Sequence, residues 1–88
     1  MDRPREFVEF CRRFHQDIFL LQPKMEDAID SVLNSFDATQ RAVLREFIES
    51  LVRNNLSDAE LGKLWTEGGA DFYLNGAGNF FKEVLRHL

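Results

Sequence analysis

The sequence predicts an all-α, compact single-domain bundle of about five short helices, and three observations support this prediction. Four segments share the apolar spacing i, i+3, i+4, i+7, which places the apolar side chains on one face of a helix. No stretch shows the sustained alternation of apolar and polar residues that is typical of a half-buried strand. A length of 88 residues is typical of one domain, so residues 1–88 are expected to form a single unit.

The apolar segments define the expected helices in chain order. Their residues are Phe7, Phe10, Cys11 and Phe14; Ile29, Val32, Leu33 and Phe36; Leu44, Phe47, Ile48 and Leu51; Leu61, Leu64 and Trp65 in a shorter segment; and Phe81, Val84, Leu85 and Leu88. The following residues are expected to form the core: Phe10, Phe14, Ile29, Leu33, Phe47, Leu51, Trp65 and Leu85.

Residues that favour helix ends separate the first three segments. Pro4 and Pro23 suit the first turns of the first and second helices, because the N–H that proline lacks would be unpaired there. Asp37, with Gln40 three residues later, predicts the start of the third helix. Asn54–Asn55 is expected to end it.

The last two helices have similar boundaries. Ser57 and Glu60 have the spacing of a capping box, which predicts the start of the fourth helix. Gly68–Gly69 is expected to end it. The glycine-containing segment 76–78 is predicted to be a turn, after which Asn79 would cap the fifth helix.

Two apolar runs lie outside the helical stripes and are expected to be connections. They are Ile18-Phe19-Leu20-Leu21 and Phe72-Tyr73-Leu74. One interpretation is that they close the ends of the core, and the other is that one of them forms a patch facing a partner. Phe19 and Tyr73 are the candidates for an anchor in that second case, because aromatic residues are frequent hot spots.

Charge and composition restrict the classes of partner. The net charge is −4, and residues 17–60 carry nine acidic against four basic residues. This balance disfavours nucleic acid and is compatible with a basic protein partner, although it could serve solubility alone. A single cysteine, no signal-peptide pattern and no apolar run of membrane length lead us to expect a cytoplasmic protein without a membrane partner.

The segment Phe14-His15-Gln16-Asp17 ends the first predicted helix, and we interpret it as a structural clasp. His15 and Asp17 flank the apolar face, where each can bond to the following connection. Catalysis would need a nucleophile and an oxyanion site, and neither is visible. Cys11 and His15 are too few ligands for zinc, with His87 far away in the sequence. No catalytic, metal or cofactor site is therefore expected.

Four acidic residues are expected to point outward from consecutive helices. Asp27 and Asp30 lie opposite the apolar face of the second predicted helix, and Glu46 and Glu49 lie opposite that of the third. Such residues usually form a solvated face. Because they share one sign on neighbouring helices, the alternative is one negative surface that contributes to partner binding.

The order of these elements resembles the small immunity proteins of bacterial contact-dependent growth inhibition systems. Phe14-His15-Gln16-Asp17 is similar to the family's signature at the end of its first helix. Residues 25–30 resemble its acidic second helix, residues 45–61 its third and fourth, and residues 78–88 its closing helix.

The resemblance implies a stoichiometric antidote. Such a protein binds, in the cytoplasm, the C-terminal toxin domain delivered by a neighbouring cell, often a nuclease, and covers its active site or its substrate surface. The alternative is a helical adaptor or regulatory module with an unrelated partner, and an enzyme ranks third. A toxin reading frame immediately upstream would separate the first two. Self-association is left open.

Overall fold

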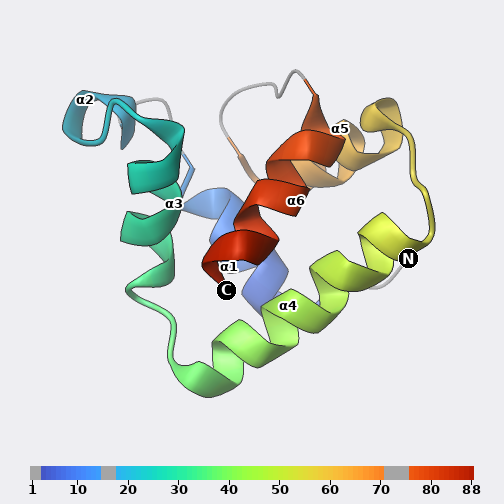
Figure 1. The fold of residues 1–88 in the computed structure, drawn as a ribbon, viewed down its shortest axis with the longest axis horizontal. Coiled ribbons are helices and arrows are strands. Elements are labelled where there is room, and N and C mark those ends of the chain that lie inside the picture. Colours follow the sequence, from blue (N-terminus) through green and yellow to red (C-terminus); the bar gives the residue numbers. More distant parts are fainter. Residues whose placement is uncertain (1–2, 15–17, 71–75) are drawn as a thin grey trace.

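Every regular element in the described part of the chain is an α-helix, as the apolar spacing predicts (Figure 1). The computed structural model describes residues 3–14, 18–70 and 76–88, without the side chains of Phe19 and Leu20. The helices are α1 (Arg5–Arg12), α2 (Ile18–Leu21), α3 (Met25–Leu33), α4 (Ala38–Arg53), α5 (Asp58–Glu67) and α6 (Ala77–His87).

The helix α2 is an addition to the predicted set. Residues 18–21 were expected to form a connection, and they form a single helical turn instead. Its backbone is closed by Gln22 N–H, which donates to Ile18 C=O at 2.8 Å, and Pro23 follows directly. The turn forms because Ile18 is buried against the core, which agrees with the interpretation that this run closes one end of it. The other described helices match the five predicted ones.

Two helices begin with the capping boxes that the sequence predicts. At the start of α4, Gln40 N–H donates to Asp37 Oδ1 at 2.8 Å, and Asp37 N–H donates to Gln40 Oε1 at 2.9 Å. At the start of α5, Glu60 N–H donates to Ser57 Oγ at 3.1 Å. Each box satisfies backbone donors that have no partner inside the helix, so short-range sequence determines both boundaries.

The predicted starts of the other helices are shifted. Pro4 is the N-cap of α1 and not a residue of its first turn. Pro23 lies one residue before Lys24, the N-cap of α3. Asn79 was expected to cap the last helix, yet α6 begins at Ala77 and contains Asn79. Its N-cap is Gly76, whose φ of 68° lies in the left-handed region that glycine adopts without steric cost.

A side chain from another helix caps α6. Gly76 has no side chain to offer, and Asp58 Oδ1 from the first turn of α5 accepts the hydrogen bond from Gly78 N–H at 2.9 Å. The two residues are 20 positions apart, so this cap depends on the packing of α5 against α6. The carboxylate of Asp58 also lies near the N-terminal, positive ends of the α5 and α6 dipoles.

We expect Asp58→Ala to lower the free energy of unfolding by about 0.5–2 kcal/mol, the usual cost of losing an N-terminal cap. Asp58→Asn retains an oxygen that accepts the bond and should lose less. Urea unfolding followed by circular dichroism measures both. Equal stability of wild type and Asp58→Ala would show that solvent satisfies the end of α6 equally well.

The last helix, α6, contacts three other helices. In Figure 1, α6 (red) lies between α3 and α4, and it packs against both of them and against α5. The helix α1 packs against α4. The radius of gyration is 11.9 Å, close to the roughly 12 Å expected for a folded chain of this length.

Arg41 closes the turn between α3 and α4. Its Nη2 donates to Leu33 C=O at 2.8 Å, and its Nε donates to Phe36 C=O at 3.2 Å. These carbonyls lie at and just beyond the C-terminal end of α3, which has no basic residue in its own last turn. A guanidinium from the next helix therefore provides the positive charge that a helix C-terminus favours.

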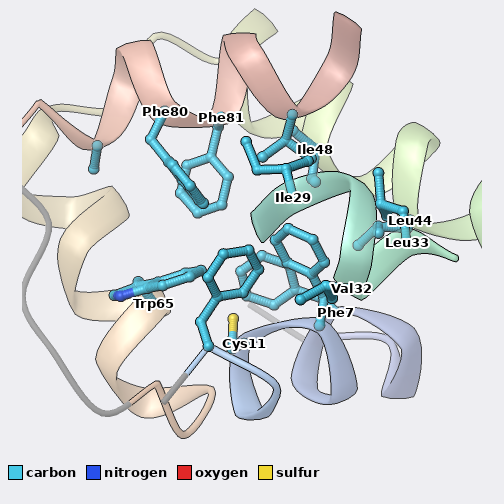
Figure 2. Close-up of a cluster of buried hydrophobic side chains, with 14 of the residues drawn as sticks. Phe7, Cys11, Ile29, Val32, Leu33, Leu44, Ile48, Trp65, Phe80 and Phe81 are labelled. Atoms are coloured by element: carbon cyan, nitrogen blue, oxygen red, sulfur yellow. The ribbon is translucent and has the colours of Figure 1, made fainter. Parts of the chain in front are cut away.

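The core confirms most of the predicted residues (Figure 2). Six of the eight predicted core residues are buried: Phe10, Phe14, Ile29, Leu33, Leu51 and Trp65. Phe47 and Leu85 are only partly buried and pack against the edge of the core. On α6 the buried face consists of Ala77, Phe80, Phe81 and Val84. This face is rotated from the predicted stripe because the helix contacts α3, α4 and α5 at once, which no local spacing encodes.

Aromatic rings join α1, α5 and α6. Trp65, which has no exposed surface, lies 5.0 Å from Phe80, 5.1 Å from Phe14 and 6.3 Å from Phe10, measured between ring centroids. Phe14 also meets Phe80 edge to face at 5.7 Å. These tilted and edge-to-face geometries are the ones that aromatic pairs prefer. Trp65 therefore lies at the junction of three helices.

Gly68 allows α1 and α5 to approach closely. A Cβ atom at this position would lie 2.7 Å from Cys11 Sγ and 2.9 Å from Cys11 Cβ, closer than real contacts of this kind. By contrast, a Cβ at Gly62 in the same helix would meet nothing within 4 Å. The glycine at position 68 is thus required by packing, in addition to ending the helix as predicted.

Candidate functional site

The four acidic candidates are all exposed, two on α3 and two on α4. Asp30 lies beside the C-terminal end of α6, where it contacts His87. Arg45 of α4 reaches the same end of α6 and donates to Leu88 C=O at 2.9 Å. Glu49 lies one turn beyond Arg45 on that flank of α4. The acidic residues of the two helices are therefore separated by the end of α6.

Glu46 belongs to a different part of α4. It lines a shallow cavity of about 320 Å³ together with Pro4, Val43, Phe47 and Ser50. Pro4 immediately precedes α1, so Glu46 lies on the flank of α4 that faces the start of α1. Glu46 and Glu49 thus lie on two different flanks of α4. Asp30, on α3, lies on the other side of the C-terminal end of α6 from the flank that carries Glu49.

Asp30 also contributes to the fold, which the sequence argument did not anticipate. Its Oδ1 lies 2.6 Å from His87 Nδ1, and His87 Nε2 lies 3.4 Å from Glu83 Oε1. The bond to Asp30 raises the pKa of His87 above its usual 6.5, with smaller contributions from Glu83 and against the effect of burial. Asp30 and His87 are 57 residues apart, so no sequence spacing could reveal the pair.

The Phe-His-Gln-Asp segment is described only at its first residue. Phe14 is fully buried among aromatic rings. His15, Gln16 and Asp17 lie outside the described residues, so the structural clasp stays a prediction. The same holds for both proposed anchors, because Tyr73 and the side chain of Phe19 also lie outside the described residues.

One large apolar side chain is strongly exposed among the described residues. Leu21, at the end of α2, exposes 81% of its surface, whereas Ile18 at the other end of the same turn is buried. The run 18–21 therefore closes the core with one residue and presents another to the surface. A single exposed leucine is common in folded proteins and does not by itself define a binding site.

Polar side chains line one cavity in the described part of the chain. The cavity between α4, α5 and α6 has a volume of about 230 Å³, and Asp58, Asn79 and Lys82 provide polar groups in its lining. Asp58 is already bonded to Gly78 N–H. No side chain here forms a nucleophile paired with a base, which acyl or phosphoryl transfer would require.

Cys11 is unsuited to metal binding or nucleophilic chemistry. The residue is fully buried, and burial raises the pKa of its thiol to about 12. A protonated, inaccessible thiol behaves as a small apolar side chain. Within residues 3–14, 18–70 and 76–88, no group of three or more His, Cys, Asp or Glu side chains is placed to hold a metal ion.

Membrane insertion can be addressed for the same part of the chain. None of its helices combines the length and the apolar character that crossing a bilayer requires. The longest, α4, has 16 residues and contains several charged side chains.

Comparison with known proteins does not assign a family. No protein-family model, curated protein or solved structure matches this chain. The fold and the surface define a small all-α protein with exposed acidic residues on α3 and on two flanks of α4. Its resemblance to the immunity proteins depends on the sequence pattern described above.

Proposed function

We propose that this protein is a cytoplasmic immunity protein that binds and neutralises the C-terminal toxin domain of a contact-dependent growth inhibition system, such as a nuclease. The observation that carries the proposal is the exposure of Asp27, Asp30, Glu46 and Glu49 on two adjacent helices in the chain. Exposed side chains of one charge on consecutive helices support binding to a protein of opposite charge. Inhibition occurs by stoichiometric occlusion.

The charge of this surface favours a basic partner. Toxins that act on nucleic acid must neutralise phosphate groups, so their substrate surfaces carry lysine and arginine. An acidic inhibitor accelerates the encounter with such a surface and competes with the substrate for the same cations. Apolar contacts then slow dissociation, and Phe19 and Tyr73 are the proposed anchors.

The cognate partner can be identified by protection of cells. Co-expression with a panel of candidate toxin domains, including any toxin encoded immediately upstream, should rescue growth for the cognate toxin. The purified pair should form a one-to-one complex. Rescue by none of the toxins, together with stable capture of an unrelated protein, would contradict the proposal and favour a helical adaptor.

The role of the acidic surface is tested by neutralising it without disturbing the fold. We choose Asp27→Asn, Glu46→Gln and Glu49→Gln together and leave Asp30 unchanged, because Asp30 tethers α6. The melting temperature should stay nearly the same. The association rate with the cognate toxin should fall about tenfold at low salt and less at high salt, because exposed charges act mainly on encounter.

A second triple variant provides a control with the same change in net charge. Glu6→Gln, Glu9→Gln and Glu60→Gln change the net charge equally on other helices, and glutamine at position 60 can still complete the capping box. This control should associate faster than the α3–α4 variant. Equal association rates of the two variants at low salt would show that only total charge matters and that the proposed surface is an ordinary solvated face.

A further inference from the structure

We propose that His87 controls the acidic surface: a protonated His87 neutralises Asp30, and release of that proton makes the carboxylate available to a lysine or arginine of a basic partner. The inference adds a regulatory step to the proposed function and relies on it for the class of partner. It can nevertheless be tested without the toxin.

His87 and Asp30 form a short contact in which the side chain of Asp30 is exposed to solvent and that of His87 is mostly buried. His87 Nδ1 and Asp30 Oδ1 are 2.6 Å apart, which is a short hydrogen bond even for two groups of opposite charge. The side chain of His87 is 17% exposed, whereas that of Asp30 is 59% exposed. A partner cation can therefore reach the carboxylate from solvent, while the imidazole is mostly covered.

The other charged groups around His87 come from two helices. On α6, Glu83 contacts His87 Nε2 at 3.4 Å and also pairs with Arg86 at 3.2 Å. On α4, Arg45 reaches the end of α6 but donates to Leu88 C=O. The cluster formed by Asp30, Glu83, Arg86 and protonated His87 is formally neutral. When His87 loses its proton, the cluster has a net charge of −1, and the carboxylate of Asp30 is its exposed acidic group.

Binding of a cation and binding of the proton therefore oppose each other. Because linkage is reciprocal, a cation that binds at Asp30 lowers the proton affinity of His87 by the same factor by which protonation weakens the cation. The hydrogen bond to Asp30 raises the pKa of His87 above 6.5, so the change occurs above this value. Acidification should reduce attraction of a basic partner, and a rise in pH through the folded-state pKa should restore it.

Titration of the His87 ring by nuclear magnetic resonance, with and without tetralysine at low ionic strength, tests the inference. In the wild type, tetralysine should lower the pKa of His87. Its affinity should be about fivefold weaker when the ring is protonated, the effect expected of one charge about 4 Å away in water. In Asp30→Asn, the pKa should be lower from the start and respond little to tetralysine.

His87→Gln is the matched variant for the binding measurement. Glutamine can donate to Asp30 but does not titrate. Between about pH 5.5 and 8.5, where histidine normally changes charge, tetralysine affinity should therefore depend on pH less than in the wild type, with His15 as the remaining histidine. An unchanged His87 pKa in the presence of tetralysine, or equal pH dependence in wild type and His87→Gln, would overturn the inference. Failure to protect against any toxin would instead contradict the proposed function and leave these titrations unaffected.

Discussion

Replacing Trp65 with alanine is expected to remove a large part of the stability of this protein. Trp65 is fully buried and touches rings from α1 and α6, so truncation leaves a large cavity where three helices meet. Such substitutions cost about 3–5 kcal/mol, against roughly 5–10 kcal/mol available to a domain of this size. Urea unfolding followed by far-ultraviolet circular dichroism should show a much lower midpoint, or loss of the folded baseline.

Two further variants separate cavity formation from other effects. Trp65→Phe retains an aromatic ring and should lose clearly less than Trp65→Ala. Phe47→Ala removes a ring that is only partly buried and lies 4.8 Å from Phe7, so its effect should also be smaller. If Phe47→Ala is as damaging as Trp65→Ala, the centre of the core has been assigned to the wrong helices.

Gly68→Ala is expected to destabilise the protein although it adds only one methyl group. That methyl would lie 2.7 Å from Cys11 Sγ and 2.9 Å from Cys11 Cβ, so α1 and α5 must move apart even if the thiol changes rotamer. Overpacking of this kind costs about 1–3 kcal/mol. Thermal and urea unfolding measure the change. Cys11→Ala in the same chain should restore part of the loss, since it removes the closest of the clashing atoms.

Gly62→Ala provides the opposite expectation in the same helix. A Cβ at this position meets nothing within 4 Å, and alanine favours the helical backbone more than glycine does. This variant should therefore gain about 0.5–1 kcal/mol. A stabilising Gly68→Ala, comparable with Gly62→Ala, would show that α1 and α5 are not in close contact at Cys11.

The parts of the fold that were predicted correctly are those determined by neighbours in the sequence. The apolar spacing located the helices from α1 to α6 apart from the single turn α2. The capping boxes at Asp37 and Ser57 located two helix starts, because the cap and its partner are three residues apart. Similarly, the outward position of the acidic residues follows from the position of the apolar face.

The features that were missed depend on contacts between distant residues. The start of α6 is determined by Asp58, whose partner Gly78 is 20 residues away. Leu85 is only partly buried because α6 presents a rotated face to three other helices at once. His87 gave no local signal, since its partner Asp30 belongs to α3. The candidate site was therefore predicted as a set of exposed charges but not as a set coupled to a titrating group.

The bonds from Arg41 to Leu33 and Phe36 have a consequence for the thermodynamics of recognition. They tie the end of α3 to the first turns of α4 across the turn, which restricts hinge motion between the two helices that carry the acidic side chains. A ligand that contacts both helices meets groups whose spacing is already fixed. Less conformational entropy is then lost on association, and more of the contact energy remains as affinity.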